Sequence, residues 1–427
     1  MKINKFVSVL LVIVLVLLTM VVGTITVNAE DSFIDGCFTY SIDSNLGKAK
    51  IVDVDNSISG DVIIPEKINE YTVNCIGTSA FKDCDKITSV FIPDTVTDIE
   101  YSAFEGCSKL SGINIPDGIK MLSLATFMNC TSLKGVSIPN SVEYLGASTF
   151  LGCISLESIV IPNSVTGLDY AVFENCHSLK SVTIPNSVTV IGGNAFKDCK
   201  QLESITIPES VDSILSYAFE NCYSLKNINI PAKVTQIANS AFSQCYSLEN
   251  IKIPDTVKSI GKNAFMWCSK LATIEIPNSV ETIGEGAFSN CLGLESVSIP
   301  ESVTKIGKKA FGFCINLKSV KINNPESVLD KEFVPTNVTI YGYADSTAFE
   351  YSQNNGNDFV LIASIGDVDG DGVVTIKDAT LTQLHASKLQ MLNKEQMSFA
   401  DIDKDGEVTI KDATTIQLYI AQYITEF

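Results

Sequence analysis

Histidine is nearly absent from this chain: among 427 residues, only His177 and His385 occur. We interpret both as surface residues, the first next to a cysteine of the repeat described below and the second on a helix near the end of the chain. The chain therefore has almost no histidine with which to form the Ser-His and Cys-His pairs of many hydrolases. This scarcity argues against an enzyme of those classes.

Basic side chains are also scarce, with 30 lysines and arginines against 49 acidic residues and a formal net charge of -19. Such a surface repels phosphates, which argues against nucleic acid as a partner and suits a soluble protein that binds cations. Only 19% of residues are charged and 45% are hydrophobic, so we expect an ordered chain with a large core.

Long apolar runs are missing except at the start, where Phe6 to Val22 forms one. Lys2 and Lys5 precede it and Val27-Asn28-Ala29 fits a small-residue cleavage site, so residues 1–29 are predicted to be a secretory signal peptide. An uncleaved membrane anchor is the alternative. After cleavage at Glu30 we expect no membrane span and a secreted or cell-surface protein.

One unit of 23 residues is repeated without an insertion. Its most regular member is a phenylalanine, which recurs at Phe81, Phe104, Phe127, Phe150, Phe173, Phe196, Phe219, Phe242, Phe265, Phe288 and Phe311. A cysteine follows three residues after each of them, from Cys84 to Cys314, and Ile-Pro pairs recur from Ile92-Pro93 to Ile299-Pro300. Each unit is therefore predicted to be one coil stacked on its neighbour.

The coil that follows Phe173 illustrates the expected structure. Val182 and Ile184 alternate with polar residues, which predicts a half-buried strand that Pro185 ends. The chain then returns along the other wall, and glycines such as Gly192 permit the corner. Strands of successive coils should pair in parallel about 4.8 Å apart and form one long sheet.

This unit resembles the leucine-rich repeat of the BspA-like type, which is found in bacterial surface and secreted proteins. The match lies in the Phe, Cys, Leu, Ile-Pro and Ser-Val positions, and the likeness with its caps covers about residues 33–362. A solenoid needs caps to cover its exposed ends. Phe38–Ile42 and Lys50–Val54 suggest an N-terminal hairpin, and Val338–Tyr343 with Ala348–Tyr351 suggests a closing strand and helix.

Thirteen cysteines in a secreted protein would ordinarily indicate disulfides. Eleven of them occupy the same site of each coil, however, so their side chains should run parallel in an inward-facing column and not point at one another. We favour buried free thiols; a metal column lacks histidine partners. A disulfide between Cys37 and Cys75, outside the column, is a plausible tie for the N-terminal cap.

The outward positions of the predicted sheet are small and polar, and Glu275 is the one acid in the row where a pair of catalytic carboxylates would lie. Phe91 and Trp267 stand isolated, so no aromatic platform for sugar rings is expected. We interpret this face as an extended binding surface for a protein or a glycan. The alternative is that a flat exposed sheet simply tolerates small residues.

Two acidic loops near the C-terminus carry the strongest chemical signal. Each has Asp at positions 1, 3, 5 and 12 and Gly at position 6, the pattern of a Ca²⁺ loop, and position 12 is Asp instead of the usual Glu. Two Ca²⁺ ions are therefore predicted, with carboxylates, a carbonyl at position 7 and a threonine at position 9 as ligands: Asp367, Asp369, Asp371, Val373, Thr375 and Asp378, then Asp401, Asp403, Asp405, Glu407, Thr409 and Asp412.

The segments that begin at Asp367 and Asp401 match at 13 of 23 positions, and each reads as a loop followed by one helix, without an entering helix. This duplication resembles the type I dockerin, over about residues 366–427. The resemblance implies a cohesin module of a scaffoldin as partner, contacted from loop positions 10 and 11 and from the helix: Ile376, Lys377, Gln383 and Leu384, and again Ile410, Lys411, Gln417 and Leu418. The best-known dockerins carry a Ser-Thr type pair at positions 10 and 11, so the Ile-Lys pair here leaves the cohesin class open. The identical faces favour binding in either of two orientations.

The sequence thus predicts an α/β repeat solenoid with a small all-α, EF-hand-like domain. The predicted parts are a signal peptide (1–29), an N-terminal cap (30–74), the repeats (75–322), a C-terminal cap (323–362), a linker (363–366) and the dockerin (367–427). The predicted function is non-catalytic adhesion within a cellulosome-like assembly that degrades polysaccharide. A dockerin-borne glycoside hydrolase or peptidase and a structural spacer are the alternatives.

Overall fold

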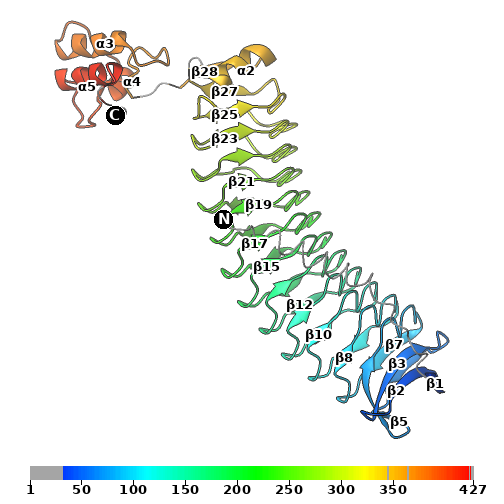
Figure 1. Ribbon diagram of the computed structural model, residues 1–427. Helices are drawn as coiled ribbons and strands as arrows, with labels where there is room; N and C mark the ends of the chain where they lie inside the picture. Colours follow the sequence, from blue (N-terminus) through cyan, green and yellow to red (C-terminus); the bar gives the residue numbers. More distant parts are fainter. Residues whose placement is uncertain (1–31, 344–345, 363–364, 423, 425–427) are drawn as a thin grey trace, which may run out of the picture.

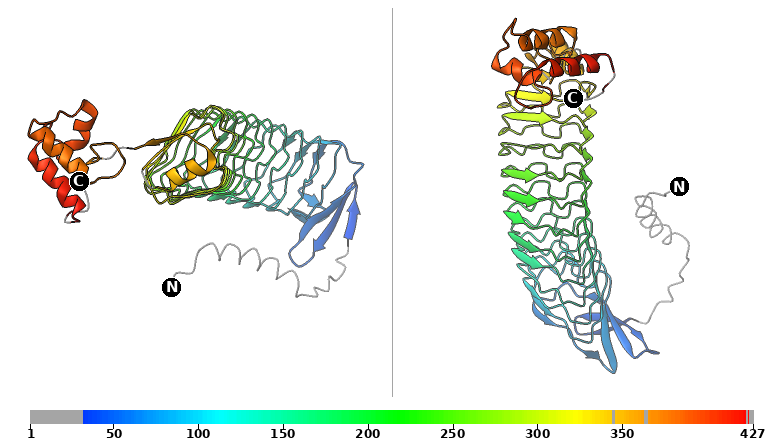
Figure 2. Two further views of the ribbon diagram at one scale, coloured as in Figure 1. Left: turned by 90° about the horizontal axis from the view of Figure 1, so that it is seen from above. Right: turned by 90° about the vertical axis from the view of Figure 1, so that its left-hand side faces the viewer.

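The computed structural model describes residues 32–343, 346–362, 365–422 and 424 (Figure 1). The predicted signal peptide lies outside the described residues. Within them, no helix is both long enough and apolar enough to cross a membrane. The chain forms a curved stack of coils between two caps, followed by a small helical body at the C-terminal end (Figures 1 and 2).

The N-terminal cap is a mixed sheet built on an antiparallel hairpin. Its strands are β1 (Ser32–Asp35), β2 (Phe38–Asp43), β3 (Lys48–Val54), β5 (Lys67–Ile68) and β6 (Tyr71–Ile76). β3 pairs in parallel with β6, and β6 pairs in parallel with β8 (Asp98–Ile99), so the predicted hairpin joins the first coil through backbone hydrogen bonds.

The Cys37–Cys75 disulfide considered from the sequence is wrong. Cys75 lies beside Lys50, the third residue of β3, whereas the carbonyl of Cys37 accepts a hydrogen bond from the amide of Asp55, just beyond the end of that strand. Five residues of extended chain separate these positions, about 16 Å, whereas a disulfide requires α-carbons within about 7 Å. Both cysteines are free.

Two ladders of short parallel strands run along the coils, where the sequence had predicted one long sheet. The first ladder carries the outward-facing small residues, and its strands are β4 (Gly60–Ile63), β7 (Ile87–Phe91), β9 (Gly112–Ile113), β12 (Ser158–Val160), β14 (Ser181–Thr183), β16 (Ser204–Ile205), β18 (Asn227–Asn229), β20 (Asn250–Lys252), β23 (Ser296–Ile299) and β25 (Ser319–Ile322). Within it, β12 pairs with β14 in a register that places Ile159 beside Val182, 23 residues later.

The second ladder lies on the returning wall and has two residues per coil. After β8 its strands are β10 (Met121–Leu122), β11 (Tyr144–Leu145), β13 (Gly167–Leu168), β15 (Val190–Ile191), β17 (Ser213–Ile214), β19 (Gln236–Ile237), β21 (Ser259–Ile260), β22 (Thr282–Ile283), β24 (Lys305–Ile306) and β26 (Val328–Leu329). Its inward residue is an aliphatic that is buried in most coils, such as Ile191 and Ile260. The repeat period predicted that the chain returns along this wall, but it did not predict that the returning segments form β-strands.

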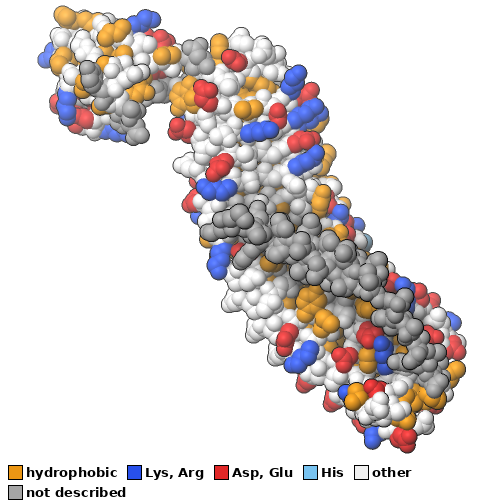
Figure 3. Space-filling view, viewed as in Figure 1, with side chains coloured by type: hydrophobic (Ala, Val, Ile, Leu, Met, Phe, Trp, Pro, Cys, Tyr) orange, Lys and Arg blue, Asp and Glu red, His pale blue; other side chains and the backbone are white. Residues whose placement is uncertain are grey.

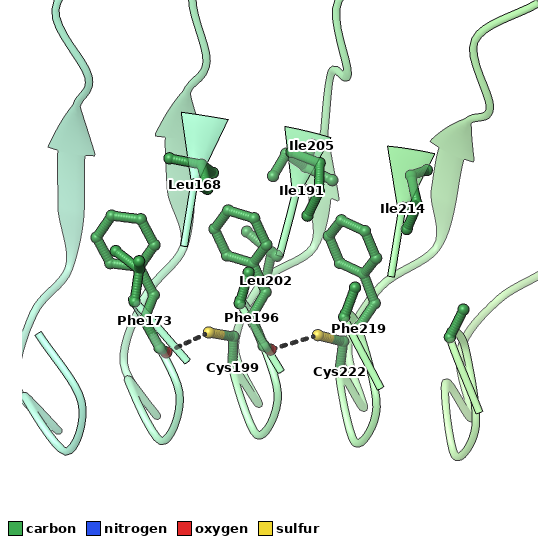
Figure 4. Packing of buried hydrophobic residues seen from close by; sticks show 14 of the residues in the cluster. Leu168, Phe173, Ile191, Phe196, Cys199, Leu202, Ile205, Ile214, Phe219 and Cys222 are labelled. Atoms are coloured by element: carbon green, nitrogen blue, oxygen red, sulfur yellow. Dashed lines mark hydrogen bonds between the residues drawn. The ribbon is translucent and has the colours of Figure 1, made fainter. Parts of the chain in front are cut away.

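The repeat phenylalanines form one continuous stack through the core. Their rings are fully buried, and neighbouring centroids lie 5.0–5.6 Å apart from Phe81 to Phe311. Figure 4 shows this for Phe173, Phe196 and Phe219. Because each ring contacts the ring above and below, no coil can bury its phenylalanine without its neighbours.

The cysteine column lies beside this stack, as the spacing predicts. Each thiol from Cys107 to Cys314 donates a hydrogen bond to the carbonyl of the phenylalanine one coil earlier, at 3.1–3.2 Å between sulfur and oxygen (Figure 4). Burial raises the pKa of Cys153 to about 12, so the neutral thiol is strongly favoured. The column therefore acts as a set of small apolar groups that also satisfy backbone carbonyls.

Gly192 serves close approach between coils and not an unusual backbone angle. A β-carbon at this position would lie 2.5 Å from the carbonyl oxygen of Asp169 in the preceding coil. Such a contact is far below van der Waals distance, so a larger residue would push the coils apart. The predicted corner glycine is thus explained by packing.

Charged side chains of both signs are mixed over the face of the stack in Figure 3. Many form ion pairs one coil apart, such as Lys226 with Glu203 at 2.9 Å and Lys318 with Glu295 at 2.7 Å. These side chains are largely exposed, so each pair contributes little to stability.

The C-terminal cap closes the core as the sequence indicates. β27 (Thr339–Gly342) pairs with β25, β28 (Phe359–Leu361) pairs with β27, and α2 (Thr347–Asn355) lies over the last coil. The ring of Tyr351 on α2 contacts Phe333 edge-on at 4.5 Å between centroids. Phe333 is the last fully buried ring of the core, and α2 shields it from solvent.

The C-terminal body contains α3 (Ile376–Ala386), α4 (Lys394–Ala400) and α5 (Ile410–Ile420). Its apolar cluster is separate from the solenoid core and small: Val368, Ala379, Leu392, Ala400, Ile402 and Ile416 are its buried members. A core of this size needs another source of stability.

Candidate metal centre and docking surface

The first acidic loop is organised by its position-12 carboxylate, Asp378, which is fully buried. Its Oδ1 accepts hydrogen bonds from the amides of Val368 and Asp369 at 2.7 and 2.9 Å, and its Oδ2 accepts from the amide of Thr375 at 2.7 Å. One side chain at the start of α3 thus ties both ends of the loop together.

Asp367, at position 1, completes the turn. Its two carboxylate oxygens accept hydrogen bonds from the amides of Gly370 and Gly372 at 3.0 and 2.9 Å. Both glycines have positive φ, 75° and 90°, which other residues adopt at a cost. The sequence thus has glycine at the two positions where the loop needs a positive φ to direct an amide at the carboxylate of Asp367.

The second loop repeats this arrangement. Asp412 is buried and accepts from the amides of Ile402 at 2.8 Å and Thr409 at 2.8 Å, and Asp401 accepts from the amide of Gly406 at 2.9 Å. The other carboxylate oxygen of Asp401, Oδ1, is buried and has no hydrogen-bond partner among the described residues. A buried carboxylate oxygen without a donor is costly unless a cation lies beside it.

The donor set fits Ca²⁺ at both loops. Carboxylate oxygens of Asp367, Asp369 and Asp371 lie within 4.8 Å of one another, and so do those of Asp401, Asp403 and Asp412. Burial, together with the neighbouring carboxylate of Asp378, raises the pKa of Asp367. A hard divalent cation held by oxygen ligands would offset that repulsion.

The remaining predicted ligands differ in how the structure uses them. Asp378 lies outside the first triad and Asp405 outside the second. The hydroxyls of Thr375 and Thr409 accept hydrogen bonds from the amides of Lys377 and Lys411, so both threonines are helix N-caps. At position 7, the side chains of Val373 and Glu407 are exposed.

One prediction about the context of the loops is wrong. The second loop does have an entering helix, because α4 ends at Ala400 and Asp401 is its C-terminal cap. Its N-cap, Asn393, exchanges hydrogen bonds with Gln396, which is a capping box. The helix was missed because only seven residues separate this cap from the loop. The first loop follows the linker after β28 and has no such helix within the described residues.

The predicted docking residues lie on α3 and α5. Ile376 and Ile410 are 60% and 52% exposed at the first turn of each helix, and Leu418 is 40% exposed. Lys377 and Lys411 are exposed too, and Lys411 Nζ lies 2.6 Å from Asp403. Gln383, Leu384 and Gln417 are half-buried. The structure therefore presents two similar helix faces, each with apolar side chains open to a partner.

Comparison with known families agrees with this construction. The model for the BspA-type leucine-rich repeat region matches residues 61–180, 166–265 and 235–354, most of the solenoid, and the type I dockerin domain matches residues 365–421. The chain belongs to the BspA-type leucine-rich repeat family. It carries a type I dockerin at its C-terminal end.

Solved structures show the same repeat fold. A leucine-rich repeat protein from Bacteroides ovatus is 28% identical with a TM-score of 0.57, covering 78% of this chain and 100% of that chain. A leucine-rich cell surface protein from Faecalibacterium prausnitzii is 27% identical with a TM-score of 0.52, covering 81% and 98%. The pneumococcal vaccine antigen PcpA, 21% identical with a TM-score of 0.56 over 78% and 99%, shares the fold. A search of curated proteins found no match.

The description of Trp267 as isolated is wrong. Its ring lies edge-on to Tyr246 with centroids 6.4 Å apart, and Tyr246 lies 5.1 Å from Tyr223. These residues occupy adjoining turns of three successive coils. The sequence comparison missed them because Trp267 is two residues after its repeat phenylalanine, whereas the tyrosines are four residues after theirs.

Proposed function

We propose that this protein is a secreted, non-catalytic binding component that docks through its dockerin onto a cohesin of a cellulosome-type assembly. The observation that carries the proposal is the duplicated loop, in which a buried aspartate fixes each loop to an exposed helix face. Ca²⁺ supplies the charge that lets the clustered carboxylates stay ionised. The chain's own groups, Asp378 and Asp412, hold the two helix starts in place.

The repeat coils supply the second half of the function, the capture of a ligand. Along the first ladder a shallow hollow of about 800 Å³ is lined by polar side chains, including Asn227, Asn250, Lys252, Asp255 and Glu275. A second hollow of about 540 Å³ continues past Glu275 to Tyr343. Extended surfaces of this kind suit the binding of a protein or a glycan more than turnover of a small substrate.

A catalytic role is less well supported by the same residues. Glu275 borders both hollows, and its neighbours in the strand row are Lys252 and Ser298. The other carboxylates of the hollows, Asp255 and Glu301, stand one residue after an Ile-Pro pair, outside this row. Glycoside hydrolysis needs two carboxylates on opposite sides of the scissile bond, one of them with a raised pKa. Polysaccharide degradation would then belong to other members of the assembly.

The test is capture of the full-length protein on beads that carry type I cohesins of several classes, with calcium and with chelator. We expect retention on at least one cohesin in calcium and release by chelator. The retained protein is then incubated with plant polysaccharides and casein. Release of reducing sugar or peptides would replace the binding role with that of a hydrolase.

A further inference from the structure

The turn that follows each repeat phenylalanine forms one lateral edge of the solenoid, and this edge changes character along the stack. From Phe81 to Phe196, the residues at the second and fourth positions after the phenylalanine are mostly small or polar. In the next three coils they include Tyr223, Tyr246 and Trp267, whose rings contact one another. We call these three residues the aromatic edge. Lys200 Nζ lies 5.9 Å from the Tyr223 ring at one end of it.

Trp267 occupies a backbone position that ordinarily excludes it. The second residue after the phenylalanine has positive φ in all eleven coils, and in eight of them it is glycine, asparagine or aspartate. Trp267 has φ 65° and is 38% exposed. A bulky side chain in the left-handed region is strained, and it contributes little to the core from there. Such strain persists mainly where a side chain serves a function at that place.

Polar groups alternate with the rings. Gln244 lies two residues before Tyr246 and accepts a hydrogen bond from its hydroxyl at 2.8 Å. Asn221, two residues before Tyr223, donates through Nδ2 to Asp198 at 3.3 Å. Its Oδ1 is buried and has no hydrogen-bond partner among the described residues.

The spacing and composition of the edge favour one class of ligand. Ring centroids recur at 5.1 and 6.4 Å, one per coil, which is comparable to the length of one pyranose unit in an extended chain. A pyranose presents C–H groups that pack on aromatic rings and hydroxyls that pair with amides and carboxylates. Two polar side chains contact the tyrosines: Gln244 accepts the hydroxyl proton of Tyr246, and Lys200 lies over the Tyr223 ring.

We infer that the aromatic edge is a second binding surface, distinct from the sheet hollows, which takes a linear neutral glycan along the solenoid axis. Trp267 supplies the principal apolar contact, the tyrosines extend it, and the polar ends of Gln244 and Lys200, which lie beside the tyrosine rings, pair with sugar hydroxyls. The inference rests on the proposed binding role of the repeat coils and is independent of cohesin docking.

Trp267 is the one tryptophan in the chain, so its fluorescence reports on the edge directly. Full-length protein is titrated with soluble xylan, mannan and mixed-linkage glucan, with polygalacturonate as the anionic comparison. We expect at least one neutral glycan to change the emission saturably. In affinity gels that contain this glycan, Trp267→Asn should bind at least ~10-fold more weakly, as expected for loss of a central aromatic contact. Trp267→Tyr should retain most of the binding.

Asparagine stands at this position in four other coils, so Trp267→Asn should melt at the same temperature as the native protein or higher. Phe91→Asn, which removes an exposed ring on the sheet face, is the matched control and should bind the glycan normally. All variants should still be captured by cohesin, which separates a failure here from a failure of docking.

Four results would overturn the inference. The first would be that no neutral glycan changes the tryptophan emission. The second would be that Trp267→Asn binds the glycan as tightly as the native protein does. The third would be that Trp267→Asn melts at a lower temperature, which would give the indole a structural role. Fluorescence change on adding cohesin alone would make the edge a protein contact and would equally contradict it.

Discussion

The repeat coils and the dockerin differ in how much apolar side chain each can bury. In the coils, a phenylalanine, a cysteine and several aliphatic residues are buried in every turn of 23 residues, and each coil is covered by two others. The dockerin buries only a small cluster around Ala379 and Ile416 and instead gathers two groups of carboxylates, with one buried member in each. The coils are therefore expected to fold without a ligand, and the dockerin is expected to depend on cation binding.

The difference also separates two uses of repetition. In the solenoid, repetition extends one core, so a change in one coil is felt by its neighbours. In the dockerin, the duplicated segment makes two equivalent helix faces, so a change in one face leaves the other intact. A change made in the solenoid should leave the dockerin unaffected, and a change made in the dockerin should leave the solenoid unaffected. Each region is therefore an internal control for the other.

Removal of calcium is expected to have the largest effect. With chelator, residues 365–422 should lose their amide protection from hydrogen exchange, because the loop carboxylates repel one another without the cation. Residues 75–322 should exchange as before. Hydrogen exchange followed by mass spectrometry measures both regions in one sample. Equal protection of the dockerin with and without calcium would contradict the metal requirement.

The change Phe219→Ala should be the most harmful single substitution of those considered. It removes a fully buried ring between Phe196 and Phe242 and should cost about 3–5 kcal/mol of unfolding free energy. Urea denaturation followed by far-ultraviolet circular dichroism gives the value, and Phe91→Ala, at an exposed ring, is the control. Calcium binding and cohesin capture should be unchanged, since they depend on the other core.

The cysteine column predicts a smaller loss. Cys199→Ala removes the thiol that donates to the Phe173 carbonyl, which keeps its second hydrogen bond from the amide of Cys176. The expected cost is about 1 kcal/mol. Reducing agent should leave the urea midpoint of the native protein unchanged. A lower midpoint in reducing agent would show that disulfides stabilise the coils.

The smallest effect is expected for one altered docking face. Ile376→Asp with Leu384→Glu should weaken cohesin binding only about twofold, because one of two equivalent orientations is lost. The matched pair Ile410→Asp with Leu418→Glu should do the same, and all four changes together should abolish binding. Calcium content of each variant is measured as a control. Complete loss from either pair alone would exclude the second orientation.

The solenoid was predictable because its determinants are local and repeated eleven times. Alternation around Val182 and Ile184, the proline stop and the phenylalanine period together specify the coil. The second ladder could not be predicted from pairs such as Val190 and Ile191, because a strand of two residues is too short to show the alternation of polar and apolar side chains. The error over Cys37 and Cys75 arose because strand register decides which residues meet, and register is not visible in composition.

The metal loops were predictable at the level of carboxylate spacing and less so in detail. Asp378 is predicted from the sequence to be a ligand. In the structure its carboxylate oxygens also accept hydrogen bonds from amides of the loop and so close the turn. Helix α4 was missed because its cap and its seven residues give too short a pattern. The aromatic edge was missed for a different reason: contacts between coils join residues at unequal positions of the repeat.

The central claim is that calcium folds the dockerin so that it can carry the solenoid to a cohesin. The most direct test is calorimetric titration of the full-length protein with a type I cohesin over a series of calcium concentrations. We predict one cohesin bound per chain in saturating calcium, affinity that falls as calcium is lowered, and no binding by the double variant Asp367→Ala and Asp401→Ala. Undiminished binding in chelator, or by that variant, would contradict the account.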